Sequence, residues 1–522
     1  MCSSAIVGLV DSRPNSCGWR AAAEVGLIFL VFFIHAACLA PDVNETHYLG
    51  KARHYWDASW CARDFFCGTA DAHQVFYWTF GWMSRWMPLS AMAWCGRLLT
   101  WGLLAWAWRR LCIALSLGPL YAVLSAALFV TLNDHCQMAG EWVIGGVEAK
   151  GFAYVLVWLG LEALVRGRWT RTLLLFGASS SFHVIIGGWA LVAAGVVWLS
   201  SADRPPLRRL ALPLVGALLL ALPGLLPALA LTWRSDPQVV NEANRIYVFE
   251  RLYHHLWPES FPALFVMRHL LLVVVLVVLV RFAPVDGRFQ KLRGFLATAV
   301  GLAAAGMAIG LLTPLDADLS ARLLRYYWFR MSDVLTPLGV AILAAALLSQ
   351  WRTAQPRWHA VALGAALLVA GGHLVETTWR RHVFARPPAD ANIVNLEAWR
   401  EMCQWAADET PADAVFLIPR LAQTFRWYSG RAEVVSRKDI PQDAAGIVEW
   451  WRRMNRIYRA EPESMETWHK SLAELGSARL RELGAEFGAD YVITAAYPAL
   501  NLERLGPVNP SFAIYRLGRR NN

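Results

Sequence analysis

The sequence predicts a polytopic α-helical membrane protein of about eleven crossings with a small C-terminal α/β domain outside the membrane. Of its 522 residues, 57% are hydrophobic and only 17% are charged, and the mean hydropathy is +0.36. Soluble chains contain roughly 25% charged residues, so disordered, collagen and coiled-coil classes are excluded. From Pro387 onward the long apolar runs stop and charged residues become common, which predicts the separate domain.

Apolar runs long enough to span a bilayer occur at 21–40, 89–108, 113–131, 151–166, 207–232, 263–283, 294–313, 334–350 and 358–378. We interpret the first run as an uncleaved span and not as a signal peptide. The stretch 171–200 is too long for one span, and Ser179–Ser181, His183 and Gly187-Gly188 interrupt it. We therefore expect two short helices that meet as a hairpin at this polar break.

Arginine distribution predicts the orientation, because short cytoplasmic loops carry excess positive charge. The arginine-rich loops lie on one side if 171–200 is a hairpin; they contain Arg109, Arg110, Arg166, Arg168, Arg204, Arg208, Arg288, Arg352 and Arg357. The prediction is a multi-pass protein of the cytoplasmic (inner) membrane, with a cytoplasmic N-terminus and an extracytoplasmic C-terminal domain. The net charge of +10 then meets anionic lipid, and no nucleic acid partner is expected.

Two domains are predicted. Residues 1–380 form the transmembrane domain, with a long first outer loop at 41–88. Residues 381–522 form the extracytoplasmic domain, in which short strand-like runs alternate with amphipathic helical patterns.

The first outer loop opens with Asp42 and Glu45, followed by His47 and Tyr48. A carboxylate at the lipid boundary is weakly screened, which raises its pKa toward that of a useful general base. The alternative is structural, because Asp42 as N-cap with Glu45 three residues later is typical of a capping box. The spacing leaves both interpretations open.

An acidic motif followed by His-Tyr, opening a long outer loop after a membrane helix, resembles the GT-C superfamily of integral-membrane glycosyltransferases. The resemblance implies a polyprenyl- or dolichyl-phosphate-linked sugar donor and Glu45, helped by Asp42, as the catalytic base. Asn44 stands where the family often has Asp, so the need for a divalent cation (Mg²⁺ or Mn²⁺) stays open.

The outer loop at 132–150 gathers Glu141, Glu148 and Lys150. GT-C proteins commonly carry a second acidic motif in a later outer loop, and the resemblance implies that Glu141 or Glu148 matches it. A membrane-surface turn with solvated charges is the alternative.

Three arginines, Arg322, Arg325 and Arg330, lie in an outer loop against the positive-inside rule. Guanidinium groups clamp phosphates bidentately, so we expect these residues to bind the donor phosphate. The alternative is an amphipathic helix whose arginines contact lipid headgroups.

Histidines His47, His183 and His254 are candidate pocket residues. His183 lies in the broken hairpin, and an ionisable group at membrane depth often serves function. His47 belongs to the acidic motif, and His254 lies in a polar-aromatic cluster of the outer loop at 233–262. His183 bonded to a backbone carbonyl is the structural alternative.

The expected function is transfer of a sugar from a polyprenyl-phosphate donor to a glycan, lipid or protein acceptor on the outer face of the membrane. The alternatives are a lipid or small-molecule transporter or flippase, and a noncatalytic scaffold whose outer domain binds glycan.

Overall fold

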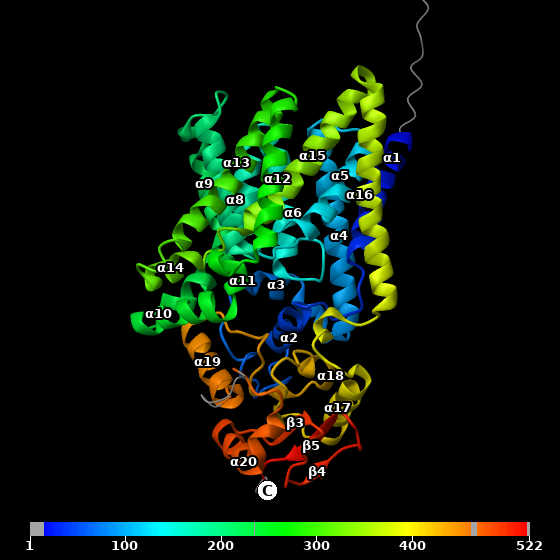
Figure 1. Cartoon of the computed structure of the whole chain (residues 1–522). Helices are drawn as coiled ribbons and strands as arrows, with labels where there is room; N and C mark the ends of the chain where they lie inside the picture. The colour runs from blue at the N-terminus through cyan, green and yellow to red at the C-terminus, as the bar shows by residue number, and fades with distance from the viewer. Residues whose placement is uncertain (1–14, 234, 461–466, 519–522) are drawn as a thin grey trace, which may run out of the picture.

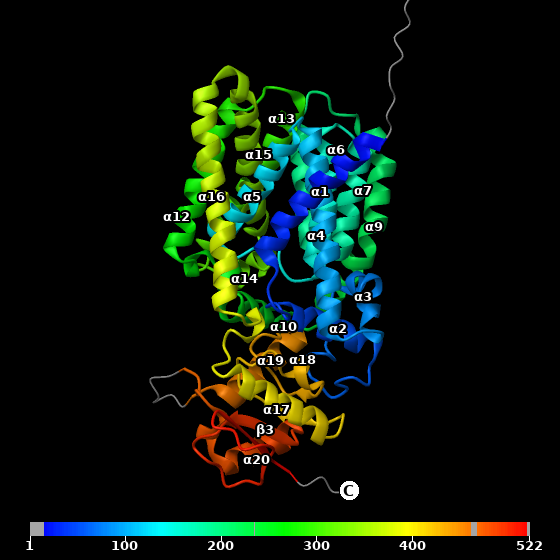
Figure 2. The same ribbon diagram turned by 90° about the vertical axis from the view of Figure 1, so that its right-hand side faces the viewer.

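The computed structural model describes residues 15–233, 235–460 and 467–518. A helical bundle forms the larger part, and a smaller domain with a β-sheet covers one end of it (Figures 1 and 2). The bundle consists of α1 (Asn15–Ala36), α4 (Leu89–Ala114), α5 (Pro119–His135), α6 (Ala149–Val165), α7 (Trp169–Phe182), α8 (Val184–Ser200), α9 (Leu207–Trp233), α12 (Ala263–Phe282), α13 (Gly287–Gly310), α15 (Arg330–Ala354) and α16 (Pro356–Val383).

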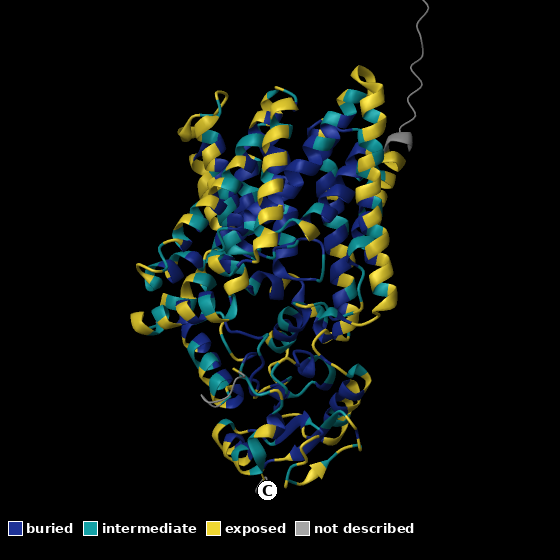
Figure 3. Cartoon of the chain, viewed as in Figure 1, coloured by how far each residue is buried: buried dark blue, intermediate teal, exposed yellow. Residues whose placement is uncertain are grey.

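The bundle has the composition of a membrane domain. Within the described chain, six of its helices are long and apolar enough to cross a bilayer, namely α1, α9, α12, α13, α15 and α16. The outward faces of α12 and α16 are exposed (Figure 3), and on α12 they consist of leucines and valines such as Leu271 and Val274. Exposed apolar faces of this size are stable in lipid and not in water. The protein is therefore a multi-pass membrane protein, while the count of eleven crossings stays a prediction.

The core of the bundle is aromatic. Trp101, Trp108 and Trp158 are fully buried, and the rings of Trp108 and Trp158 meet edge-to-face with centroids 5.1 Å apart. Helix α15 lies in the centre of the bundle, and 89% of the residues in its most apolar 18-residue stretch are buried. Such packing fixes the depth of both ends of α15, and its outer end begins at Arg330.

Residues 171–200 form the predicted hairpin. Helices α7 and α8 are separated at His183, whose extended backbone (φ −151°) breaks the helical ladder. Helices α7 and α8 pack against one another and against α9, and Trp169 at the start of α7 and Trp198 near the end of α8 line one apolar cavity. Gly187 permits the close approach, because a Cβ there would lie 2.2 Å from the backbone nitrogen of Ser180.

The turns rich in arginine gather at one end of the bundle. Figures 1 and 2 show the α12–α13 and α15–α16 turns at the end opposite the sheet domain. This separation agrees with the predicted orientation, although the side of the membrane on which each terminus lies stays a prediction.

Short helices lie between the bundle and the sheet domain (Figure 1). They are α2 (Glu45–Trp56), α3 (Gln74–Thr79), a 3₁₀ turn (Gly81–Arg85), α10 (Pro237–Arg245), a π-helix (Ile246–Arg251), α11 (Tyr253–Leu256), a 3₁₀ turn (Pro258–Ser260) and α14 (Ala317–Leu324). These segments form the layer in which loops from distant parts of the chain meet.

The C-terminal domain is an α/β domain, as predicted. Its sheet has the strand order β2-β1-β3-β5-β4, with β1 (Val415–Leu417), β2 (Ala432–Glu433), β3 (Tyr491–Ala495), β4 (Arg504–Leu505) and β5 (Phe512–Arg516). Strand β1 pairs in parallel with β2 and β3, and β5 is antiparallel to β3 and β4. The helices are a 3₁₀ turn (Pro388–Asp390), α17 (Leu396–Glu409), α18 (Phe425–Ser429), α19 (Ala444–Tyr458), a 3₁₀ turn (Leu472–Leu475) and α20 (Gly476–Phe487).

Alternating side chains of the strands enter two separate cores. Val415 and Leu417 pack with residues of α19 and α20 on one face, whereas Phe416 packs with α17 and α18 on the other. This period-2 pattern makes the domain a sheet covered by helices on both faces.

Glu45 anchors the first outer loop to the bundle. Its side chain is fully buried, and its two oxygens accept 2.7 Å hydrogen bonds from Nε and Nη2 of Arg97 on α4. The same oxygens accept from the backbone N–H groups of Val147 (3.0 Å) and Asp42 (2.7 Å). This carboxylate therefore joins α2, α4 and the 136–148 loop.

A second buried ionic cluster joins the first outer loop to the C-terminal domain. Arg426 of α18 donates to Asp64 of the outer loop over 2.7 Å and to Asp439, and its Nη1 lies 3.8 Å from Glu433. The four side chains are at most 3% exposed. We call these residues the Arg426 cluster.

Replacing Glu45 with Gln would leave the buried guanidinium of Arg97 without its counter-charge. Breaking one side of a buried ion pair costs about 3–5 kcal/mol, so we expect the melting temperature in detergent to fall by several degrees. The double variant Glu45→Gln/Arg97→Met removes both charges and should recover much of this loss. An unchanged melting temperature for Glu45→Gln would contradict the anchoring role.

Stability should also depend on pH through Glu433. Burial, together with the nearby Asp64 and Asp439, raises the pKa of Glu433 from 4.5 to about 8 although Arg426 opposes the rise. The folded chain thus binds this proton more tightly than the unfolded chain. Its contribution to stability is full below pH 4.5 and is lost as the pH rises toward 8.

Thermal unfolding of the wild type and Glu433→Gln across this pH window measures the effect. The wild type should lose stability with rising pH more steeply than the variant, whose amide does not titrate. Asp439 does not interfere, because its pKa is depressed and it titrates only at acid pH. If the stability of the wild type and of Glu433→Gln changed with pH in the same way, Glu433 would not be protonated in the folded chain at neutral pH.

Candidate functional site

A cavity of about 800 Å³ lies where the bundle, the short outer helices and the C-terminal domain meet. Its wall is built by α2, the 136–148 loop, the α7–α8 break, α9, the π-helix and the segment after β2. Figure 1 shows α2 and α11 between the bundle and the sheet domain. Both domains therefore contribute to the cavity wall, the C-terminal domain through the segment after β2.

Two acids and two cations form the polar centre of the cavity. The ammonium nitrogen of Lys150 lies 3.4 Å from Glu148 and 3.7 Å from Glu141. The Nε of Arg330, at the start of α15, lies 3.1 Å from Glu141. All four side chains are at most 11% exposed. The predicted Glu141, Glu148, Lys150 and Arg330 are thus brought into one cluster.

The two acids differ in their surroundings. Burial raises the pKa of Glu148, although Lys150 partly offsets the rise. Asn44 donates weakly to Glu148, over 3.3 and 3.4 Å. One oxygen of Glu141, Oε1, is buried without a hydrogen-bond partner among the described residues. Glu148 therefore has the properties of a base, whereas Glu141 mainly pairs with Lys150 and Arg330.

Further cations come from the C-terminal side of the cavity. Lys438, which follows β2, donates to Asn44 over 2.6 Å. Burial and the neighbouring Arg251 lower the pKa of Lys438 to about 8. Arg251, at the end of the π-helix, donates to the carbonyls of Arg437 and Lys438. These cations face the polar centre across the cavity and favour an anionic ligand.

The opposite part of the wall is apolar. Val184, Gly188 and Val192 of α8 face Leu225 and Leu229 of α9 along the cavity. Both helices carry exposed apolar side chains on their outer surfaces. One cavity therefore combines a charged end at the C-terminal domain with an apolar wall between membrane helices.

The three predicted pocket histidines all line the cavity. His183 Nε2 lies 2.9 Å from Nη1 of Arg330, which donates to it, and His47 Nδ1 lies 3.1 Å from Asp439 of the Arg426 cluster. Burial lowers the pKa of His47. Burial and Arg251 lower the pKa of His254 to about 4. Neutral His47 and His254 can shape the pocket and hydrogen bond without adding charge.

Asp42 and Glu45 occupy a different position. Neither is part of the cavity wall. Asp42 Oδ2 accepts a 2.7 Å bond from Gly146 N–H, and Glu45 accepts from Asp42 N–H. The predicted capping box is not formed, because α2 begins at Glu45 with Asn44 as its N-cap, and Asn44 makes no side-chain capping bond. The catalytic role that the resemblance implies for Glu45 stays a prediction, but its carboxylate is occupied by structural partners.

The three arginines of the predicted phosphate clamp separate in the structure. Arg330 belongs to the polar centre. Arg325 lines the cavity and donates to Asn244 over 2.5 Å. Arg322 lies exposed on α14 and is not part of the wall. Arg322 lies on α14, Arg325 directly follows this helix, and Arg330 begins α15. The three side chains therefore point in different directions.

The donor set of the polar centre does not suit a divalent cation. Mg²⁺ and Mn²⁺ bind oxygen ligands, and here Lys150 lies between the two carboxylates, with Arg330 against Glu141. The positive charge that a metal would supply is provided by these side chains.

Arg251 is a cavity residue that the sequence did not indicate. Lys438 was visible only as part of a basic segment that could bind glycan or form a plain domain surface, and Asn44 only as a departure from the acidic motif. Lys438 follows Arg437 in this segment of the C-terminal domain, and Arg251 precedes the Tyr253–Trp257 segment of histidines and aromatic residues in an outer loop. The signal that could have found them is their shared side of the predicted topology. The predicted topology could not show that Arg251 and Lys438 are neighbours, because 187 residues separate them in the chain.

Comparisons with known proteins return a short family match and a remote structural likeness. Residues 397–457 match a family model described as a domain of unknown function (DUF6798). No curated protein matches the chain. The fold is similar to "Crystal Structure of ArnT from Cupriavidus metallidurans bound to Undecaprenyl phosphate", with 14% identity and a TM-score of 0.39, over 98% of this chain and 99% of that one.

Proposed function

We propose that the protein is a glycosyltransferase that moves a sugar from a polyprenyl-phosphate-linked donor to an acceptor hydroxyl on the outer face of the cytoplasmic membrane. One observation carries the proposal: a single cavity has an apolar wall between α8 and α9 and a cluster of buried acids and cations at its other end. A lipid-linked sugar phosphate has the same two parts, an apolar chain and an anionic head.

The donor phosphate belongs among the cations. Arg330 can present two N–H groups to phosphate oxygens, and Lys438 faces it from the C-terminal domain. Both side chains are largely buried, where low dielectric strengthens their interaction with an anion. The polyprenyl chain then lies along the apolar side chains of α8 and α9.

Glu148 is the base in this mechanism. The acceptor oxygen attacks the anomeric carbon while its proton passes to Glu148, and the bond from that carbon to the phosphate oxygen breaks. The electron pair leaves with the polyprenyl phosphate, whose added charge is stabilised by Arg330 and Lys438. A single displacement of this kind inverts the anomeric centre. Glu141 keeps Lys150 and Arg330 in place.

The acceptor enters from the C-terminal domain, because the membrane side is taken by the lipid chain. A glycan, a lipid or a protein can each present a hydroxyl there. The orientation proposed from the arginine distribution places this opening outside the cell membrane.

Purified protein in liposomes that contain a polyprenyl-phosphate sugar tests the function directly. Formation of a glycosylated product, measured by mass spectrometry, supports transfer. Movement of the intact donor between leaflets without product would instead identify a lipid transporter, and neither event with a range of acceptors would contradict both enzymatic and transport functions.

Glu148→Gln keeps the size and hydrogen bonding of the side chain but removes its basicity. We expect sugar transfer per folded molecule to fall by about two to four orders of magnitude. Because Lys150 loses one of its two buried partners, the melting temperature also falls, so activity is measured well below it. Glu259→Gln is the matched control, because Glu259 is exposed on the same outer layer and should retain full activity. Full activity in Glu148→Gln would remove this residue from the mechanism and leave Glu141 as the next candidate.

Arg330 and Arg322 form a second matched pair, since only Arg330 lines the cavity. A charge-assisted hydrogen bond contributes about 1.5–3 kcal/mol, so Arg330→Gln should raise the KM for the donor at least about tenfold. Arg322→Gln should leave kcat and KM unchanged. Equal effects of the two substitutions would assign both residues to lipid headgroups.

A further inference from the structure

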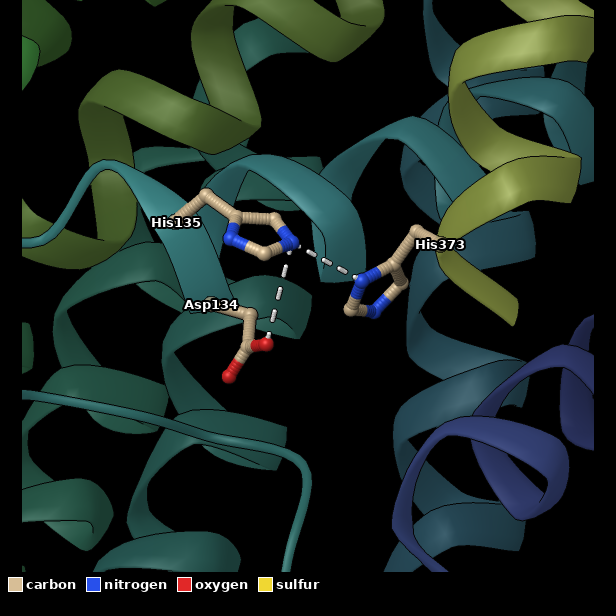
Figure 4. A group of neighbouring side chains, drawn as sticks. All are labelled: Asp134, His135 and His373. Atoms are coloured by element: carbon tan, nitrogen blue, oxygen red, sulfur yellow. Dashed lines mark hydrogen bonds and ion pairs between the residues drawn. The ribbon is translucent and has the colours of Figure 1, made fainter. Parts of the chain in front are cut away.

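A separate group of metal-binding side chains lies outside the cavity. Asp134 and His135 end α5, and His373 lies on α16, which passes beside it (Figure 4). One ligand atom from each residue lies within 4.8 Å of the others. Asp134 and His135 are exposed and His373 is buried, so the group is open on one side. None of the three is part of the cavity wall.

The nitrogen and oxygen atoms converge on a common point. His135 Nε2 lies 3.1 Å from His373 Nδ1, and Asp134 Oδ2 lies 4.0 Å from His135 Nε2. Figure 4 shows the two rings and the carboxylate turned toward one another. Two imidazoles and one carboxylate are a ligand set that zinc sites use with water as the fourth ligand.

A third histidine orients His373 from behind. His35, at the end of α1, places its Nδ1 3.0 Å from His373 Nε2. When His373 donates its Nε2 hydrogen to His35, the lone pair of Nδ1 points toward His135. Metal-binding histidines are commonly held in this way through their second nitrogen.

The neighbouring arginine does not block the group. Arg380 lies 4.0 Å from Asp134 Oδ2 but 3.4 Å from Glu376, one helical turn before it on α16. Its side chain is 51% exposed, so it can pair with Glu376 while Asp134 binds a cation.

We propose that Asp134, His135 and His373 bind one divalent transition-metal ion of the zinc class. Imidazole nitrogen favours Zn²⁺, Ni²⁺ or Cu²⁺ over Mg²⁺ and Ca²⁺. The ion joins α5, which continues into the loop of Glu141 and Glu148, to α16, which continues into the C-terminal domain. It thus ties together the two segments that bring the two sides of the cavity into contact, and its role is structural.

The test uses the full-length chain, purified in detergent with a tag that contains no histidine and treated with EDTA. Zn²⁺ binding is measured by calorimetry, and Co²⁺ binding by its visible absorption. The variants are His135→Ala and Asp134→Asn, because both residues are exposed and their replacement should not disturb folding. His359→Ala is the control, since His359 lies on α16 but bonds to Tyr121 outside the group.

Loss of an outer-shell partner already weakens metal binding by roughly 10–100-fold, so His135→Ala should weaken Zn²⁺ binding by about 100-fold or more. The same variant should lose the Co²⁺ absorption and the rise in melting temperature that Zn²⁺ gives the wild type. His359→Ala should behave like the wild type. Equal Zn²⁺ affinity in the wild type, His135→Ala and Asp134→Asn, or no binding by the wild type at micromolar Zn²⁺, would overturn the proposal.

Discussion

The buried guanidinium of Arg426 is the contact on which the cavity depends. It bonds to Asp64 from the first outer loop and to Asp439 from the C-terminal domain, and Asp439 in turn contacts His47 on the cavity wall. Buried charges are costly unless geometry and pairing are nearly complete. The C-terminal domain therefore has one well-defined position on the bundle, and the side chains that it adds to the cavity, Lys438 and Gln442, are placed by that position.

The cavity combines two environments that rarely meet in one site. Its apolar wall continues the lipid-facing surfaces of α8 and α9, whereas its charged end is enclosed by the loops of the outer layer. Cations outnumber acids in the described lining. The acids are Glu141 and Glu148, and the cations are Lys150, Arg251, Arg325, Arg330 and Lys438. A phosphate bound at this end would balance the excess charge, so electrostatics and hydrophobic burial favour the same kind of ligand.

Acidic residues in the two outer loops have different roles in this structure. Glu45 and Asp42 bond to the backbone of Val147 and Gly146 and so hold the loop that carries Glu148. Gly146 fits this contact, since a Cβ there would lie 2.7 Å from Cβ of Asp42. The first acidic motif thus supports the second, and the proposed base is held by a carboxylate that we predicted to be the base itself.

Several features followed from the sequence alone. Apolar runs determined the helices, the polar break at Ser179–His183 determined the hairpin, and the change in composition after Pro387 determined the separate domain. The helices and their break at His183 appear in the structure, because hydrophobic periodicity and helix breaking are local properties of the chain. The domain boundary and the count of eleven crossings stay predictions. The clustering of Glu141, Glu148 and Lys150 was also visible, because they lie within ten residues of one another.

Only the tertiary structure decided which charges face one another. Arg97 lies 52 residues from Glu45 in the chain. No local sequence pattern indicates that the two side chains form an ion pair. Lys438 meets Asn44 across 394 residues, and Arg322 and Arg330 diverge although they lie in one short loop. Long-range pairing depends on how rigid helices pack and on the cost of burying each charge, and neither quantity is written in local sequence patterns. The sequence therefore determined the elements and their polarity, and the packing of the two domains determined the site.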